Sequence, residues 1–225
     1  MSSKTAAVLL DIDGTLVDST YHHALAWHRA FARVGDVPAL WRIHRSIGMG
    51  GDKLVAHVAG EEVEEQHGDY LRDSWREEYR KVRAEVRPLQ GAADLVRALS
   101  DGGLRTALAS SGDPEFAREA VGLLGIGDRI EVLTTSEDAD GSKPEPDLIR
   151  ATLDRMEGVE RAVLVGDTPY DVEAANRAGI ECITLTTGGF SSAELIEAGA
   201  SMVAESPGEL SDVNWQLYLA QPQAG

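Results

Sequence analysis

The 225-residue sequence has a single cysteine, Cys182, and only 5% of its residues are aromatic. One cysteine excludes an internal disulfide and any metal site built from several cysteines. Basic residues are also scarce, because 21 lysines and arginines stand against 38 aspartates and glutamates, for a net charge of −17. This deficit argues against binding nucleic acid or an anionic membrane through bulk charge, although a small anion can still bind in a local pocket.

Long hydrophobic runs are absent as well. The first apolar run, Ala6 to Leu10, ends at Asp11 and is too short for a signal peptide. No stretch approaches the roughly 18 apolar residues of a membrane-spanning helix. At 43% hydrophobic residues the chain can still form a sizeable core, which excludes a disordered acidic tail. We therefore expect a cytoplasmic protein that binds neither nucleic acid nor membrane.

Short, continuous apolar runs alternate with helical patterns along the chain. Four clear runs and two weaker ones occupy residues 6–10, 106–109, 162–165, 182–185, 130–133 and 201–203. Runs of this kind are typical of parallel strands buried on both faces. Helix-start signals are found at Asp113 with Pro114, at Ser191 with Glu194, and at Ser206. The alternation predicts an α/β protein with a doubly wound, Rossmann-like parallel sheet.

The region from Thr20 to Arg87 breaks this alternation and contains no convincing strand. Apolar residues such as Trp27 recur there at helical spacing, which predicts that they form a core of their own. Arg80, Lys81 and Arg83 are predicted to lie on a solvated helix face. We expect an all-helical cap of residues 18–87 inserted into a catalytic core of residues 1–17 and 88–225.

Polar residues follow the apolar runs, where open α/β sheets bind their ligands. Asp11 and Asp13 are two positions apart, so on an extended backbone their side chains point the same way, and Gly14 permits a turn after them. Two carboxylates in one volume can divide the roles of nucleophile and general acid/base. The alternative is an ordinary strand exit, in which aspartate and glycine are common.

Three further motifs lie at expected strand ends or in adjoining loops. Asp167 ends one apolar run, and Asp171 follows one helical turn later, where it either shares the site or favours a helix N-terminus. Lys143 lies on a loop stiffened by prolines, from which it can offer a point charge to phosphate, although most lysines are solvated. Ser110 and Ser111 offer hydroxyl and backbone N–H groups to an anion oxygen.

Together these residues resemble the motif series of the haloacid dehalogenase superfamily of hydrolases, over nearly the whole chain. The residues that carry the resemblance are Asp11-x-Asp13-Gly14-Thr15, Ser110, Lys143 and Gly166-Asp167-x-x-x-Asp171. The helical insertion resembles the cap of the family's first cap class. The resemblance implies that Asp11 attacks phosphorus to form an aspartyl-phosphate. It also implies that Asp13 protonates the leaving oxygen and then activates water.

The resemblance further implies a Mg²⁺ ion held by the Asp11 carboxylate, the Asp13 backbone carbonyl and Asp167, with Asp171 supporting it directly or through water. Ser110 and Lys143 would hold the phosphoryl oxygens. Electrostatics agree, because two carboxylates 4 Å apart repel by about 1 kcal/mol in water and roughly 4 kcal/mol at an intermediate dielectric. Lys143 and a hard divalent ion would supply the positive charge that such a cluster needs.

We therefore predict a Mg²⁺-dependent phosphatase for a small phosphorylated metabolite, such as a sugar phosphate or a phosphoglycolate-like ester, acting as a monomer or weak homodimer. The presence of Asp13 favours phosphate esters, because a halide leaving group needs no proton. Six further residues are expected to bind substrate: Gly14, Thr15, Ser111, His23, Gly50 and Lys53.

Two alternatives remain at this stage. One is an isomerase resembling β-phosphoglucomutase, favoured by His23, which matches a cap histidine of those enzymes. Against it, the turn from Gly48 to Gly51 offers no arginine for a second phosphate. The other is a domain that binds metal or phosphate without turnover, which the presence of both Asp11 and Asp13 disfavours.

Overall fold

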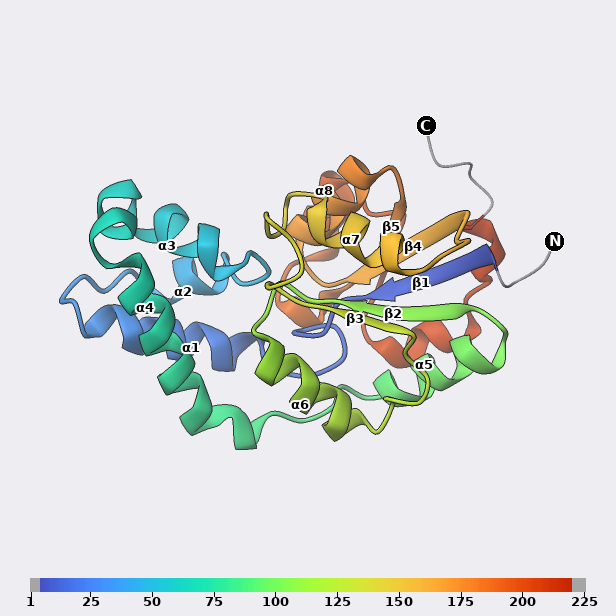
Figure 1. Cartoon of the computed structure of the whole chain (residues 1–225), viewed down its shortest axis with the longest axis horizontal. Helices are drawn as coiled ribbons and strands as arrows, with labels where there is room; N and C mark the ends of the chain where they lie inside the picture. The colour runs from blue at the N-terminus through green and yellow to red at the C-terminus, as the bar shows by residue number, and fades with distance from the viewer. Residues whose placement is uncertain (1–4, 220–225) are drawn as a thin grey trace.

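A computed structural model describes residues 5–219 and shows one six-stranded sheet in the order β3-β2-β1-β4-β5-β6 (Figure 1). All neighbouring strands are parallel. The strands are β1 (Ala6–Leu10), β2 (Arg105–Ala109), β3 (Val132–Thr134), β4 (Arg161–Gly166), β5 (Glu181–Leu185) and β6 (Met202–Ala204). The predicted doubly wound α/β fold is confirmed, and β3 and β6 begin only one or two residues later than predicted.

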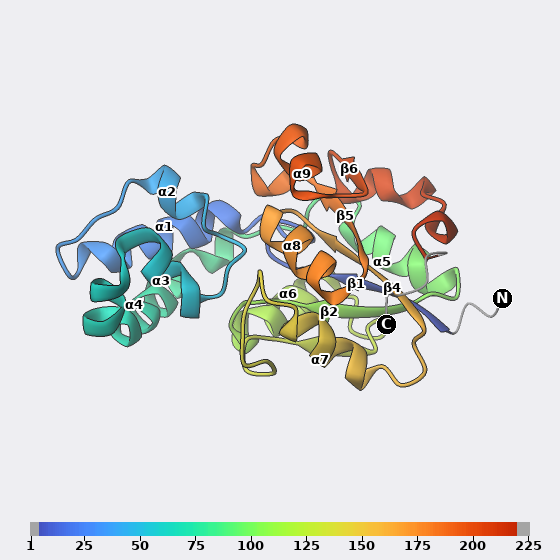
Figure 2. The same cartoon turned by 90° about the horizontal axis from the view of Figure 1, so that it is seen from above.

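Helices cover both faces of the sheet, α5 and α6 on one and α7 and α8 on the other (Figures 1 and 2). Strand β1 is buried along its whole length because its side chains alternate between two cores. Val8 and Leu10 pack with α5 and α6, whereas Ala7 and Leu9 pack with α7 and α8. The helices of the core are α5 (Ala92–Asp101), α6 (Pro114–Leu124), α7 (Asp147–Arg155), α8 (Pro169–Ala178) and α9 (Ser192–Ala198).

A helical segment lies between β1 and β2 in the sequence and, in space, at the end of the sheet toward which β1 points (Figure 2). Its helices are α1 (Thr20–Ala32), α2 (Leu40–His44), α3 (Gly51–Ala59) and α4 (Glu61–Val82). These helices enclose a separate hydrophobic core that includes Trp27, Phe31 and Leu71, as predicted for Trp27. None of the helices within residues 5–219 is long and apolar enough to cross a membrane.

The two connections of this segment to the sheet run side by side. Val17 forms an antiparallel bridge with Pro88. The backbone N–H of Asp18 donates to the carbonyl of Arg87 at 2.9 Å, and the N–H of Leu89 donates to the carbonyl of Leu16 at 2.9 Å. The chain therefore leaves the sheet and returns to it at one place, directly beyond the end of β1.

Helices begin at all three predicted starts, but the last is of another type. Asp113 caps α6, and Ser191 with Glu194 forms a capping box at α9. Ser206 is the N-cap residue of a 3₁₀ helix, η4 (Pro207–Asp212), and its side chain makes no capping bond within residues 5–219. The Glu209 carboxylate accepts from the backbone N–H of Glu205.

Arg80 and Lys81 are exposed, as the prediction of a solvated helix face requires, and Arg83 is half-buried. The sequence did not predict that Arg80 and Arg83 would also pair with carboxylates of the core. Arg80 pairs with Glu115 at 2.5 Å, and Arg83 pairs with Glu115 at 2.8 Å and with Glu119 at 2.5 Å. These acidic residues lie on α6, so the end of α4 is joined to the core through opposite charges.

Candidate active site

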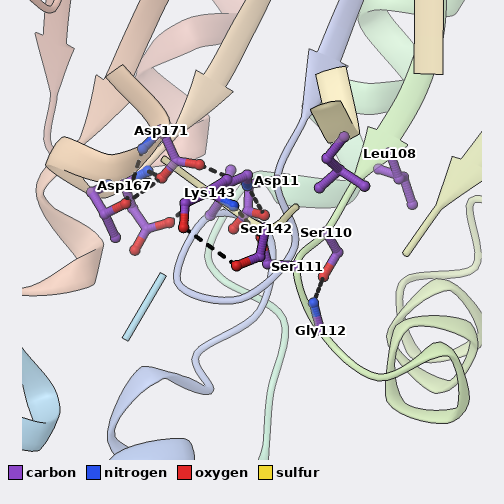
Figure 3. A network of polar contacts seen from close by, with 12 residues as sticks. Asp11, Leu108, Ser110, Ser111, Gly112, Ser142, Lys143, Asp167 and Asp171 are labelled. Atoms are coloured by element: carbon purple, nitrogen blue, oxygen red, sulfur yellow. Dashed lines mark hydrogen bonds and ion pairs between the residues drawn. The ribbon is translucent and has the colours of Figure 1, made fainter. Parts of the chain in front are cut away.

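The carboxyl ends of β1, β2 and β4 bring together the residues that the sequence placed at strand ends (Figure 3). Asp11 follows β1, Ser110 follows β2 and Asp167 follows β4, while Lys143 comes from the loop before α7. All four are at least 94% buried. Asp171 joins them from the first turn of α8.

Three carboxylates and one ammonium group form the centre of this site. Oxygens of Asp11, Asp167 and Asp171 lie within 4.8 Å of one another. Lys143 Nζ lies 2.5 Å from Asp11 Oδ1 and 2.7 Å from Asp171 Oδ1. Lysine is rarely buried without such partners, so Lys143 is clearly a member of this cluster and not a surface residue.

The pKa values show that the cluster lacks positive charge. Burial raises the pKa of Asp11 to about 7, helped by repulsion from Asp171 and Asp13 and opposed by Lys143. Burial and repulsion from Asp171 and Asp11 hold the pKa of Asp167 well above its usual range. Burial acts to lower the pKa of Lys143, but attraction to Asp11 and Asp171 outweighs it and raises that pKa. A further cation at this point would lower the cost of ionising all three carboxylates.

The surroundings of Asp167 leave one of its oxygens free. Oδ1 accepts from Thr15 Oγ1 at 2.7 Å, whereas Oδ2 is buried without a hydrogen-bond partner. A Cβ atom on Gly14 or Gly188 would overlap Oδ2, and Gly14 has a φ of +78° that side chains disfavour. Two glycines thus keep space beside an unpaired carboxylate oxygen. The donor set of carboxylate oxygens fits Mg²⁺.

Asp171 performs both of the roles that the sequence left open. Its Oδ2 accepts from the backbone N–H groups of Asp167 at 3.2 Å and Thr168 at 3.0 Å, and the second of these bonds is half of a capping box at the start of α8. Its Oδ1 points to Lys143. The helix cap therefore also fixes the carboxylate in the cluster.

The carboxylate of Asp13 is not part of this cluster. It accepts from Ser19 Oγ at 2.5 Å and pairs with His23 Nε2 at 2.9 Å, both from the helical segment or its entry. Burial acts to raise the pKa of Asp13, but His23 and Ser19 outweigh it and leave the pKa below its usual value. Asp13 and Asp11 still line one cavity of about 60 Å³, as their spacing predicted.

The aromatic support of His23 was not anticipated from the sequence. Its ring stacks on Tyr79 with centroids 4.0 Å apart, and Trp75 lies 5.6 Å away on the same side of α4. Ser19 and His23 are four residues apart, as are Trp75 and Tyr79, a spacing that places each pair on one helix face. The sequence shows this spacing, but it does not show that the helix face with His23 packs against the helix face with Tyr79.

The predicted anion loop lies beside Lys143. Ser110 Oγ accepts from the backbone N–H of Gly112 at 3.0 Å (Figure 3). Ser111 Oγ accepts from the Lys143 backbone N–H at 3.5 Å. All three loop residues line the cavity that holds Asp11, so hydroxyl groups and backbone N–H groups lie close to the buried ammonium.

Gly50 and Lys53 contact the lysine loop. The Gly50 N–H donates to Ser142 Oγ at 3.1 Å, and Lys53 Nζ donates to the Ser142 carbonyl at 2.9 Å. The structure thus places these two residues, expected at the substrate, between the helical segment and the loop that carries Lys143.

A second contact joins α2 to the core and was not foreseen. Arg45 pairs with Glu194 at 2.5 Å and lies over the Phe190 ring at 3.9 Å. His44 Nε2 lies 3.1 Å from the carbonyl oxygen of Gly188, the residue that packs against Asp167. The helical segment is therefore held to the core on both sides of the site.

The fold and the site define an α/β protein with a buried aspartate–lysine cluster at its strand ends, covered by an inserted helical segment. The chain belongs to the haloacid dehalogenase-like hydrolase family, whose sequence model matches residues 8–185.

Several relatives are similar over most of their length. A phosphoglycolate phosphatase of Yersinia pseudotuberculosis serotype I is 34% identical, over 80% of this chain and 81% of the relative. An N-acetylmuramic acid 6-phosphate phosphatase of Pseudomonas aeruginosa is 26% identical, over 92% of this chain and 93% of the relative. The crystal structure of a hydrolase from Pseudomonas syringae superimposes with a TM-score of 0.86 at 30% identity, covering 91% of this chain and 95% of that one.

Proposed function

We propose that this chain is a Mg²⁺-dependent phosphatase that hydrolyses a small phosphate monoester through an aspartyl-phosphate formed on Asp11. The observation that carries the proposal is the buried cluster of Asp11, Lys143, Asp167 and Asp171, which is short of one cation. The relatives described above act on phosphoglycolate and on a phosphorylated amino sugar acid, which supports the same class of reaction.

In the proposed first step, an Asp11 carboxylate oxygen forms a bond to phosphorus while the bond from phosphorus to the leaving oxygen breaks. Asp13, held beside His23, gives a proton to that oxygen. In the second step, a water molecule attacks the phosphorus of the aspartyl-phosphate, and Asp13 takes a proton from that water. The bond between phosphorus and the Asp11 oxygen breaks, so inorganic phosphate is released and the Asp11 carboxylate is restored. Mg²⁺ bound by Asp11, Asp167 and Asp171 would supply positive charge to the transferring phosphoryl group.

The remaining residues have supporting roles in this proposal. Lys143 favours the charged form of Asp11 and, with Ser110 and Ser111, faces the phosphoryl oxygens. We also propose that residues 18–87 act as a cap on a core of residues 1–17 and 88–225, which the paired connections at Val17 and Pro88 support.

Hydrolysis is favoured over phosphosugar transfer because a mutase needs a cationic site for a second phosphate. Arg72 and Arg76 are the cationic side chains that line the cavity next to the site within the described part of the chain, and both are paired with carboxylates.

The test is release of inorganic phosphate from a panel of esters with and without Mg²⁺. We expect Mg²⁺-dependent release that Asp11→Asn reduces by roughly a thousandfold or more, with unchanged circular dichroism. Asp154→Asn, at an exposed position on α7, is the matched control. Near-normal activity of Asp11→Asn would sink the mechanism, and interconversion of glucose 1-phosphate and glucose 6-phosphate without phosphate release would show a mutase.

A further inference from the structure

The cavity that holds Asp11 and Asp13 is small. Its volume is about 60 Å³, whereas one water molecule occupies about 30 Å³ in the liquid. On the side of the helical segment its wall is mostly apolar and includes Trp27, Leu54 and Trp75, with His23 beside Asp13. This space suits a phosphoryl group and its leaving oxygen, so the rest of a substrate must extend elsewhere.

A second cavity of about 230 Å³ adjoins the first and shares Gly51, Trp75 and Ser111 with it. It lies between α3 and α4 on one side and the loops before α6 and α7 on the other. Trp75 and Ser111 are therefore at the passage from one cavity to the other. The second cavity is the space into which a leaving group can extend.

The charges in the wall of this second cavity are compensated. Arg76 Nε lies 2.7 Å from Asp113 Oδ2, and a second nitrogen of Arg76 lies 3.0 Å from Asp73. Arg72 pairs with Glu64 at 2.9 Å and also donates to the Gly51 carbonyl. Within residues 5–219 no other lysine or arginine lines the cavity. A negatively charged leaving group would find both guanidinium groups already engaged.

Two carboxylates, those of Asp52 and Asp140, face the same space and form no pair with a lysine or arginine of residues 5–219. Asp52 accepts at 3.4 Å from the backbone N–H of Ser142, and Asp140 lines the opposite loop. An anion placed among these groups would lose hydration and meet like charge. Hydroxyl groups, in contrast, can donate to the carboxylates and accept from Ser111 and Ser136, while the Trp75 ring offers an apolar surface.

We propose that the second cavity binds an uncharged, polyhydroxylated leaving group, a sugar or a cyclitol, and that the Arg76–Asp113 pair excludes small anionic leaving groups such as glycolate. This inference rests on the proposed phosphatase function. It assigns specificity to residues outside the cluster that carries the chemistry.

The first test compares kcat/KM for glucose 6-phosphate, inositol 1-phosphate and 2-phosphoglycolate in the presence of Mg²⁺. We expect at least one of the two hydroxylated esters to be preferred over 2-phosphoglycolate by about tenfold or more. An equal or higher value for 2-phosphoglycolate would overturn the inference and leave the phosphatase function standing. No turnover of these esters or of p-nitrophenyl phosphate would overturn the proposed function and this inference together.

The second test releases Arg76 from its partner with Asp113→Asn. Asparagine is as good a helix N-cap as aspartate, so α6 should keep its start while the negative charge is lost. The ratio of kcat/KM for 2-phosphoglycolate to that for the preferred hydroxylated ester should rise about tenfold, because the Arg76 guanidinium that faces the cavity then keeps only its pair with the exposed Asp73.

Asp52→Asn provides an independent variant, because it removes a carboxylate from the wall without touching Arg76, and the same ratio should rise. Asp94→Asn is the matched control, since Asp94 pairs with Arg97 on α5. A ratio that stays constant in both Asp113→Asn and Asp52→Asn would refute the assignment.

Discussion

At the scale of single residues, the hydrogen-bond and ion-pair partners of each carboxylate oxygen determine which oxygen is available to a cation. Asp171 uses one oxygen for the helix cap and one for Lys143, and Asp13 is engaged by Ser19 and His23. The buried oxygen Oδ2 of Asp167 has no partner. A buried carboxylate oxygen is costly to leave unpaired, so this atom is the strongest candidate in the cluster for a cation ligand.

The pKa of Asp11 leads to a prediction about metal binding. Folding raises that pKa from 3.8 to about 7, so this group's contribution to the stability of the metal-free chain is complete below pH 3.8 and lost as the pH rises through 7. At pH 6 a cation must displace the proton of Asp11, whereas at pH 8 Asp11 is largely ionised. Because the pKa of Asp167 is raised as well, the apparent dissociation constant for Mg²⁺ should be at least tenfold larger at pH 6 than at pH 8.

Isothermal titration calorimetry in buffers of different ionisation enthalpy measures both the affinity and the protons released. Asp167→Asn should weaken binding at both pH values, whereas Asp128→Asn, at a largely exposed position, should change neither. Equal affinity at pH 6 and pH 8, with no proton release, would contradict the electrostatic description of the cluster.

At the scale of elements, α9 shows how one cap can stabilise two parts of the molecule. Glu194 accepts from the backbone N–H and the hydroxyl of Ser191 and also pairs with Arg45, which follows α2. These interactions lower the pKa of Glu194 from 4.5 to about 2. A lowered pKa gives stability that is present above pH 4.5 and is lost as the pH falls toward 2.

We expect Glu194→Gln to lower the melting temperature at pH 7 by ~1–2 °C, a small effect because the side chain is 42% exposed. The difference from the unmodified chain should shrink as the pH falls from 6 to 3.5. Differential scanning calorimetry measures it, and Glu197→Gln on the exposed side of α9 is the control. A difference that grows in acid would show that the Glu194 interactions do not stabilise the fold.

The sequence predicted most of the elements and the cluster, but not how the helical segment meets the core. Asp11, Lys143 and Asp167 were predictable because continuous apolar runs mark parallel strands and ligands bind where such strands end. The contact of Arg83 with α6 was not predictable. An arginine that faces solvent and an arginine that faces an acidic helix occur at the same spacing along their own helix. The partner of Arg83, Glu119, is 36 positions away in the sequence.

At the scale of the whole molecule, α4 is joined to α6 by arginine–carboxylate pairs along one line. Arg76 meets Asp113, and Arg80 and Arg83 meet Glu115. The line runs from the substrate cavity toward the paired connections near Pro88. These pairs are partly exposed, so each contributes little by itself, yet together they favour the position of the helical segment seen here.

The double variant Arg80→Gln/Arg83→Gln removes two of the arginines that pair with α6, so the helical segment should separate from the core more often. The backbone N–H of Gly50 reports on this separation, because it is buried and donates to Ser142 across the contact. Its hydrogen exchange, measured by NMR, should become about two- to fivefold faster.

A matched double variant, Arg97→Gln/Arg129→Gln, removes two arginines whose pairs with Asp94 and Asp101 lie within the core. It should leave the exchange of the Gly50 N–H unchanged. Equal acceleration by both variants would mean that net charge, not the contact between α4 and α6, controls the opening.

The central position of β1 has a consequence for the order of synthesis. Of the six strands in residues 5–219, β1 leaves the ribosome first, but its neighbours are β2 and β4, and β4 begins at Arg161. At about 5–20 residues per second, the roughly 150 residues between them take about 8–30 s to translate. The helical segment, whose contacts are local, can fold during that interval. The five apolar residues of β1 meanwhile have no complete sheet to join, so they stay without their β4 partner until the last third of the chain is made.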